Sequence, residues 1–325
     1  MIRNEHKKAL PVLSFPAVSL MGKTVREMIH DSNLYAEGLK MVADRVPSAA
    51  AVSFMDLSVE AECFGADIRT SDSEVPTVIG HIVEDEDDAK ALQIPAVGAG
   101  RTGITIEAVK KAAQLITDRP VFAGVIGPFS LAGRLLGVSE AMVLCLEEPE
   151  TVEPVLEKVT AFLIDYCMAF KEAGADGVVL AEPLAGILSP NLAEEFSAPY
   201  CRRIAQAIQD KDFIMIYHNC GNAVDKMLDS ILTIGAGAYH FGNAVSMKDI
   251  LEKMPADALV MGNIDPAAQF MNGSPDSMRE SVLALRRACA SYPNFVLSSG
   301  CDIPPKASWD NIDAFFQAAG EEMIT

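Results

Sequence analysis

The segment KEAGADGVVLAEP, residues 171–183, contains the pattern that decides the fold. A stretch compatible with a helix ends at Gly174, a short loop follows, and an unbroken apolar run then leads to Glu182 and a proline. Glycine commonly ends a helix, and a strand that is apolar at every position is typical of a parallel sheet covered on both faces. The segment therefore predicts the helix–loop–strand unit of an α/β protein.

The same unit recurs along the chain, for example in LTIGAGAYH at residues 232–240, and a helix with one apolar stripe is expected at 151–173. We identify seven strand candidates, at 50–55, 121–127, 177–183, 213–220, 238–243, 258–265 and 295–302, with an eighth expected near 77–97. This count predicts one domain over residues 1–325, a single (β/α)8 TIM-type barrel with an N-terminal helical extension of about 45 residues. The alternative is an open doubly wound sheet, but no G-x-G-x-x-G follows the first strand.

Composition excludes several classes of partner. The 325 residues include 45 acidic and 26 basic side chains, a formal charge of −19, so neither nucleic acid nor an anionic membrane is an expected partner. No apolar stretch approaches the roughly 18–20 residues that span a bilayer, and the N-terminus lacks a secretory pattern, which predicts a cytoplasmic protein. The seven scattered cysteines are expected to be free thiols or metal ligands and not a disulfide framework.

Polar residues collect where the predicted strands end, which is the face that carries the active site of such barrels. They are Asp56, Glu182, His218, Cys220, Asn243, Asn263, Asp265, Cys301 and Asp302. In IYHNC, residues 216–220, His218 and Cys220 are two residues apart in an extended segment, so both side chains can reach one metal ion. Barrel closure would bring Cys301 to the same mouth. One histidine and two cysteines suit zinc and leave a fourth position open, as in catalytic sites.

Simpler interpretations stay open for these residues. Buried cysteines commonly only pack. Glu182 could cap the helix expected after Pro183.

Four blocks of the chain resemble the uroporphyrinogen decarboxylase superfamily, from about residue 20 to the end. They are FMDLSVEAECFGADI (54–68), VFAGVIGPFSLAGRLLG (121–137), AEPLAGILSPNLAEEFSAPY (181–200) and MGNIDP (261–266). Within this superfamily the chain is similar to the zinc-dependent methylcobamide:coenzyme M methyltransferases. That branch is distinguished by a His-x-Cys and a distant Cys that bind zinc, and these fall on His218, Cys220 and Cys301.

The resemblance implies a zinc enzyme that moves a methyl group from a methylated corrinoid, its co-substrate, to a small thiol such as coenzyme M. It implies catalytic roles for Glu182 and Asp56, and contacts to the cofactor by Asn243, Asn263 and Asp265. The D-x-H-x-x-G signature of cobalamin-binding domains is absent, so a separate corrinoid protein is the expected partner. The acceptor thiol and the original methyl donor stay open.

Two alternatives remain at this point. A decarboxylase-like lyase would need no metal, and a zinc-binding barrel without catalysis would close the metal with a fourth protein ligand. Decarboxylases of the superfamily carry N-terminal arginines, whereas the corresponding segment FPAVSLMGKT (15–24) contains Lys23 and no arginine. They also tend to have histidine where this chain has Cys301. Both departures favour the methyltransferase.

Overall fold

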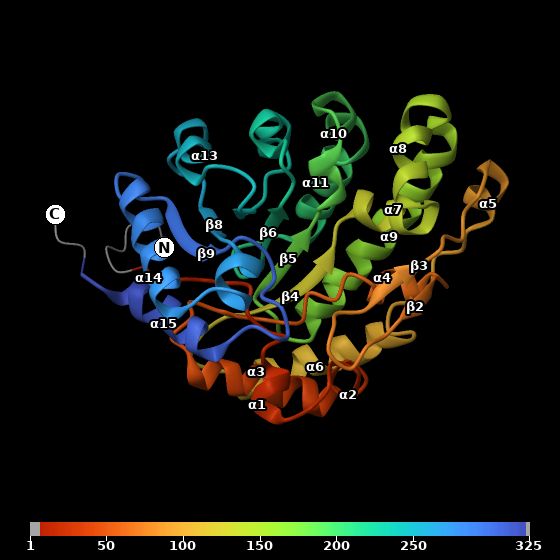
Figure 1. Cartoon of the computed structure of the whole chain (residues 1–325). Coiled ribbons are helices and arrows are strands. Elements are labelled where there is room, and N and C mark those ends of the chain that lie inside the picture. The colour runs from red at the N-terminus through yellow and green to blue at the C-terminus, as the bar shows by residue number, and fades with distance from the viewer. Residues whose placement is uncertain (1–6, 323–325) are drawn as a thin grey trace.

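The computed structural model describes residues 7–322 and shows a curled parallel sheet with helices around its outside (Figure 1). All seven strand candidates form this sheet, in the order β1-β4-β5-β6-β7-β8-β9, and every neighbouring pair is parallel. Their bounds are β1 Ala51–Val52, β4 Val121–Ile126, β5 Gly177–Ala181, β6 Ile214–Asn219, β7 Ala238–Phe241, β8 Val260–Ile264 and β9 Phe295–Ser299. The predicted TIM-like α/β fold is confirmed.

Helices connect successive strands and cover the outer face of the sheet (Figure 1). Those that precede β5 are α4 Val59–Cys63, α5 Glu86–Ala91, α6 Arg101–Leu115, α7 Pro128–Leu136, α8 Val138–Glu147 and α9 Pro149–Glu172. Those that follow β5 are α10 Pro190–Phe196, α11 Ala198–Ile208, α12 Leu228–Leu232, α13 Met247–Lys253, α14 Pro275–Ala288 and α15 Trp309–Gly320. Single turns of 3-10 or π helix lie at η1 Leu184–Ile187, η2 Val224–Lys226 and η3 Pro266–Met271.

The N-terminal extension predicted over about 45 residues is helical in part: three helices lie between residues 17 and 45, residues 7–16 are not helical, and residues 1–6 lie outside the described part of the chain. It contains α1 Ala17–Met21, α2 Val25–Ile29 and α3 Ser32–Arg45. In Figure 1 these helices lie along the lower side of the barrel, where α3 runs beside α6.

The prediction of an eighth barrel strand near 77–97 is wrong. β3, Thr77–Ile79, pairs antiparallel with β2, Asp67–Arg69, in a separate two-stranded sheet. The segment 9–13 instead occupies the gap between β9 and β1: Leu10 N donates to Leu297 O (2.9 Å), and Ala49 N donates to Ala9 O (2.8 Å). Pro11 cannot donate a backbone hydrogen bond, so this segment joins the barrel through a few bonds and not through a regular ladder.

Successive side chains of each strand point alternately to the two faces of the sheet, so the apolar residues form an inner cluster and an outer one. The inner cluster fills the barrel and includes Leu10, Val12, Val52, Phe122, Val179, Ala181, Ile216, Ala238, Met261 and Val296. Because side chains two apart share a face, the next inward positions of β6, β7 and β9 are His218, His240 and Ser298. The barrel interior therefore changes from apolar to polar at the carboxyl ends of these strands.

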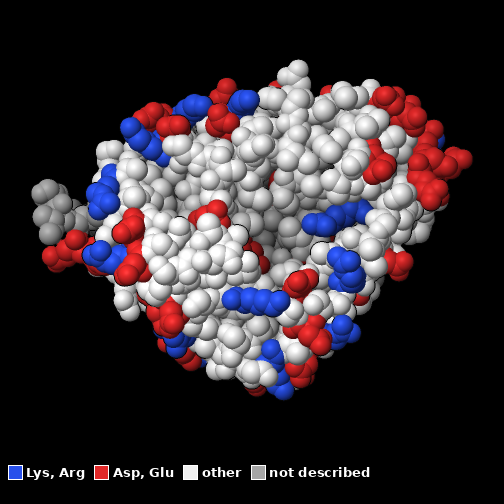
Figure 2. All heavy atoms as spheres, in the orientation of Figure 1, with Lys and Arg blue, Asp and Glu red and all other residues white. Residues whose placement is uncertain are grey.

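The face shown in Figure 2 has a hollow near its centre, above the position of β5 and β6 in Figure 1. Acidic side chains gather at one edge, where α5 and α8 lie in Figure 1; the run VEDEDDAK (83–90) belongs to this region. Within residues 7–322 no single helix is long and apolar enough to cross a membrane; α7 and α8 meet the criteria only as a pair, and that pair is bent by 101°.

Candidate metal centre

The structure brings His218, Cys220 and Cys301 together at the carboxyl ends of β6 and β9. One ligand atom from each residue lies within 4.8 Å of the other two, and Nε2 of His218 is 3.4 Å from Sγ of Cys301. Within the described part of the chain this is the one group of three or more such residues that could hold a metal ion. An imidazole nitrogen and two sulfurs form a donor set that fits Zn²⁺.

Tight backbone packing fixes the position of Cys220. A Cβ atom added to Gly242, at the end of β7, would lie 2.6 Å from both Cα and Cβ of Cys220. Gly242 N also donates to Asn219 O (3.1 Å). Glycine at 242 thus lets the loops after β6 and β7 approach closely enough for Cys220 to face the barrel mouth.

The two cysteines differ in acidity. The Cys301 thiol, as a hydrogen-bond donor, lowers the pKa of Cys220 to about 4 against the opposing effect of burial. The interaction with Cys220, together with burial, raises the pKa of Cys301 well above its usual value. The two thiols therefore titrate as a coupled pair, in which Cys220 gives up its proton more readily than Cys301.

His240 and Ser298 extend this site into the barrel. His218 and His240 are register partners on β6 and β7, and their Nδ1 atoms are 2.7 Å apart. Nε2 of His240 is 2.8 Å from Oγ of Ser298. Burial lowers the pKa of His240 well below its usual value, so this ring is neutral at neutral pH. His240 lies inside the strand predicted at 238–243, and its pairing with His218 is not visible in the sequence because the register between strands is not encoded locally.

Glu182 lies outside the metal group and binds the start of α7 instead. Its carboxylate accepts hydrogen bonds from Phe129 N (3.1 Å), from Ser130 N (2.6 Å) and from Oγ of Ser130 (2.6 Å). A Cβ at Gly127 would lie 2.2 Å from this carboxylate, so the helix must begin at glycine. Val179 and Ala181 face the interior, so Glu182 falls on the outer face of β5, away from the barrel axis. The expected capping role applies to α7 and not to the helix after Pro183.

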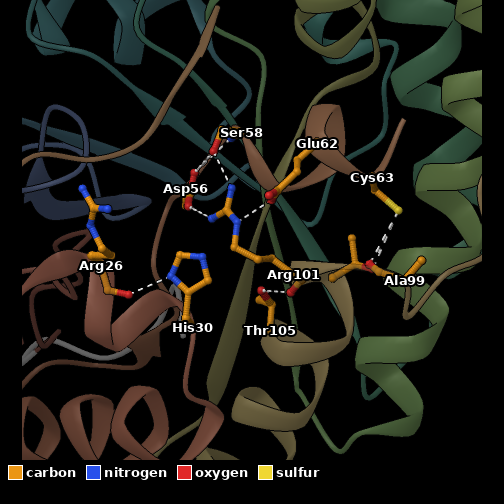
Figure 3. A network of polar contacts seen from close by, with 10 residues as sticks. Arg26, His30, Asp56, Ser58, Glu62, Cys63, Ala99, Arg101 and Thr105 are labelled. Atoms are coloured by element: carbon orange, nitrogen blue, oxygen red, sulfur yellow. Dashed lines mark hydrogen bonds and ion pairs between the residues drawn. The ribbon is translucent and has the colours of Figure 1, made fainter. Parts of the chain in front are cut away.

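Asp56 follows β1 and forms a buried ion pair with Arg101, the first residue of α6 (Figure 3). Its Oδ1 accepts from Ser58 N (3.1 Å) and from Oγ of Ser58, and that Oγ in turn accepts from Nη2 of Arg101 (2.9 Å). Glu62 contacts the opposite side of the guanidinium (Figure 3). Arg101 is separated from Asp56 by 45 residues, so no local pattern in the sequence indicates this pair.

Three residues that are predicted to contact a cofactor hold the loops after β7 and β8. They are Asn243, Asn263 and Asp265. Nδ2 of Asn243 donates to Asp265 (2.9 Å), and Nδ2 of Asn263 donates to the carbonyls of Gly242 (2.9 Å) and Val245 (2.8 Å). Asp265 also caps η3 through the N–H groups of residues 267 and 268. These bonds shape the rim of the mouth, and contact with a cofactor stays a prediction.

Three polar atoms near Asp56 are buried without a hydrogen-bond partner within residues 7–322. They are Oε2 of Glu60, Nε of Arg134 and Oδ1 of Asp302. Arg134 lies close enough to Glu60 and Asp56 for their charges to raise its pKa, although burial lowers it more. Burial raises the pKa of Asp302 well above its usual value, and the nearby Asp56 adds to that effect. Asp56 therefore lies among buried polar atoms that the described residues leave without a hydrogen bond.

Known proteins resemble this chain over most of its length. The uroporphyrinogen decarboxylase (URO-D) family model matches residues 12–322. The methylcobamide:CoM methyltransferase MtbA of Methanosarcina acetivorans is 27% identical and covers 95% of this chain and 94% of its own. MtbA of Methanosarcina mazei is 29% identical, with 81% and 77% covered. The uroporphyrinogen decarboxylase of Hydrogenovibrio crunogenus is 23% identical, with 91% and 85% covered.

A solved methyltransferase from Methanosarcina mazei has the same fold, with a TM-score of 0.86 at 23% identity, over 98% of this chain and 95% of that one. The family model extends over nearly all the described residues, from the segment that closes the barrel to the end of α15. The chain therefore belongs to the uroporphyrinogen decarboxylase family.

Proposed function

We propose that this chain is a methyltransferase that binds zinc through His218, Cys220 and Cys301 and moves a methyl group from a methylated corrinoid to a small thiol. The observation that supports this most directly is the convergence of one imidazole nitrogen and two sulfurs within 4.8 Å at the barrel mouth. Relatives that match over most of the chain carry the name methylcobamide:CoM methyltransferase, which makes coenzyme M the first thiol to test.

The donor set leaves room for the acceptor thiol. Zinc in a catalytic site keeps three protein ligands, and within residues 7–322 no fourth histidine, cysteine or carboxylate joins the group. When bound, zinc would lower the pKa of an incoming thiol, so that the acceptor reacts as a thiolate at neutral pH. The negative charge of Cys220 and Cys301 as thiolates would offset the charge of the ion and would keep the acceptor sulfur electron-rich.

The transfer itself balances as a simple displacement. A lone pair on the acceptor sulfur forms the new C–S bond, and the pair of electrons of the cobalt–carbon bond leaves with cobalt. The chain must hold the sulfur at the open end of the barrel, where a corrinoid can approach from solvent. The hollow near the centre of the face in Figure 2 is consistent with such an approach. Arg134 lies near Asp56, lacks a partner for its Nε and forms no ion pair within the described residues, which favours a contact with an anionic end of the thiol.

The alternatives fit the structure less well. A decarboxylase acting on a substrate with many carboxylates needs several free cations at the mouth. Arg26 is paired with Asp72 on the surface and Arg101 is neutralised by Asp56 and Glu62, so of these three arginines only Arg134 has no ion-pair partner within the described residues. A zinc site without catalysis would need a fourth protein ligand. Direct roles in the reaction for Asp56, Glu182, Asn243, Asn263 and Asp265 stay predictions, as do a separate corrinoid protein as partner and a cytoplasmic location.

Metal analysis of protein purified without chelators tests the proposal. We expect about one zinc per chain in the wild type and in Cys63→Ala, a matched control in which a half-buried cysteine outside the site is removed. Cys220→Ala should lose most of its zinc, because two protein ligands hold the ion far less tightly than three.

Activity is measured as thiol-dependent demethylation of methylcobalamin with coenzyme M, homocysteine and 2-mercaptoethanol. Cys63→Ala should match the wild type, and Cys220→Ala should be inactive. Full activity in protein that contains no zinc would rule out the proposal.

A further inference from the structure

A chain of four groups leads from the barrel wall to the metal ligand His218. It begins at the carbonyl of Leu10, in the segment that closes the barrel, which accepts a hydrogen bond from Oγ of Ser298 (2.6 Å). Oγ of Ser298 is 2.8 Å from Nε2 of His240, and Nδ1 of His240 is 2.7 Å from Nδ1 of His218. All three side chains are buried. Nε2 of His218, at the far end, faces Sγ of Cys301.

The carbonyl of Leu10 determines where each hydrogen lies in this series of hydrogen bonds. A carbonyl can only accept, so the single hydroxyl hydrogen of Ser298 points to Leu10. Oγ of Ser298 must then accept from His240, which places the hydrogen of a neutral His240 ring on Nε2. Nδ1 of His240 is consequently an acceptor, and it requires the hydrogen to lie on Nδ1 of His218.

A second contact reaches the same conclusion without the serine. The backbone carbonyl of His240, also an acceptor only, lies 3.3 Å from Nδ1 of His218. Both neighbours of this nitrogen therefore favour a hydrogen on it. The lone pair of a neutral His218 ring is left on Nε2, the atom that faces the metal group.

We propose that His240 and Ser298 are positioning residues that hold His218 in the tautomer whose Nε2 can bind the metal. The inference rests on the proposed metal site but goes beyond it, since neither residue touches the ion. Outer partners of metal-bound histidines commonly set the tautomer and ring orientation, and their loss typically weakens metal binding about 10–100-fold. Here the outer partner is a second histidine whose own tautomer is fixed by a serine and a backbone carbonyl.

The tautomer can be observed in the zinc-free wild type, without any variant. In protein labelled with ¹⁵N-histidine, nitrogen chemical shifts distinguish protonated from unprotonated ring nitrogens, and the chain has only five histidines, so spectra of His218→Gln and His240→Gln assign the two signals. We expect His218 to carry its hydrogen on Nδ1 and His240 on Nε2. A hydrogen on Nε2 of His218 in the zinc-free protein would overturn the proposal.

Metal affinity gives the second readout, by zinc competition with a chromogenic chelator. Ser298→Ala removes the acceptor for His240, so its ring can reverse and His218 can take the wrong tautomer; we expect about 10-fold weaker zinc binding. Ser298→Thr keeps the hydroxyl and should bind zinc within about 2-fold of the wild type. Ser299→Ala is the matched control: Ser299 is equally buried on β9, and its Oγ accepts from Val12 N (3.0 Å) outside the chain of four groups.

The outcomes separate the two proposals. Equal weakening in Ser298→Ala and Ser299→Ala would show a general loss of packing and refute the positioning role, as would wild-type affinity in Ser298→Ala. A wild type with the expected tautomer that fails to bind zinc would refute the proposed function and leave the hydrogen-bond chain intact. If Ser298→Ala does not fold, the spectrum of the wild type decides.

Discussion

Replacing Arg101 by methionine tests how much its charge stabilises the buried carboxylate of Asp56. Side chains of Arg101 and Asp56 are only 4% and 3% exposed, so the guanidinium is the charge that compensates a carboxylate removed from water. Ser58 supplies the other hydrogen bonds to Asp56, but it is neutral. Methionine keeps much of the length of arginine and fills the space, so the change removes charge more than volume.

The expected loss in free energy of unfolding follows from how deeply the two carboxylates paired with Arg101 are buried. Breaking a buried ion pair at one end typically costs about 3–5 kcal/mol, because the other charge stays buried without compensation. Glu62 adds little, since its side chain is 35% exposed and an exposed pair is worth roughly 0–1 kcal/mol. We therefore expect Arg101→Met to lower the free energy of unfolding by about 3–5 kcal/mol. Adding Asp56→Asn should restore at least about 2 kcal/mol, because the uncompensated charge is gone.

Urea unfolding, followed by circular dichroism and by fluorescence of Trp309, the single tryptophan, measures these differences. All samples need the same zinc content, since a bound metal raises apparent stability. Arg26→Met is the matched control: its pair with Asp72 is 55% and 67% exposed and should be worth less than about 1 kcal/mol.

A loss below about 1 kcal/mol for Arg101→Met, equal to that of Arg26→Met, would show that water reaches Asp56 and would refute the argument. Both Arg101→Met and Asp56→Asn should keep their zinc, since neither residue belongs to the metal group.

Three further predictions concern other charged side chains. Burial raises the pKa of Glu60 from its ordinary 4.5 to about 7, so between these pH values the folded state keeps a proton that the unfolded state has lost. The contribution of Glu60 to the free energy of unfolding should be complete below pH 4.5 and should fall by about 3 kcal/mol as the pH rises through 7. In Glu60→Gln the free energy of unfolding should depend less steeply on pH across this range. Glu182→Gln places an amide N–H against the N–H groups that begin α7, so unfolding should become easier by about 1–3 kcal/mol with zinc content unchanged; a loss of zinc would instead place Glu182 at the metal. Arg134→Gln should raise KM by about 10-fold for anionic thiols and leave KM for 2-mercaptoethanol unchanged, and an equal rise for both would exclude a charge contact.

The sequence was sufficient to predict the seven sheet strands and the convergence of His218, Cys220 and Cys301 for the same physical reason. Strands covered on both faces must be apolar along their whole length, so each one stands out as a continuous run. Side chains two apart in a strand share a face, and parallel strands end at one edge, so His218, Cys220 and Cys301 had to converge once the barrel was assumed.

The features that sequence analysis missed depend on relations between distant segments. The segment 9–13 is short, contains a proline and resembles no regular strand, so its place between β9 and β1 appears only when both edges are present. Glu182 follows from alternation along β5, but which face of the strand is the inner one is fixed by the packed barrel. The pairing of His218 with His240 depends on the register of β6 against β7, which no local pattern encodes.

The segment 9–13, which closes the barrel between β9 and β1, also helps to position His218 and Cys301. Ile303 N donates to Val12 O (3.0 Å), so this segment holds the chain just after Cys301. Leu10, two residues earlier, supplies the carbonyl that orients Ser298 and, through His240, His218. Cys301 and His218 come from strands that are not neighbours in the sheet, yet both are held by residues 10–12. The same residues complete the barrel wall, so His218 and Cys301 can take these positions only when the barrel has closed. The geometry of the proposed metal site is therefore a property of the whole fold and not of the His-x-Cys segment alone.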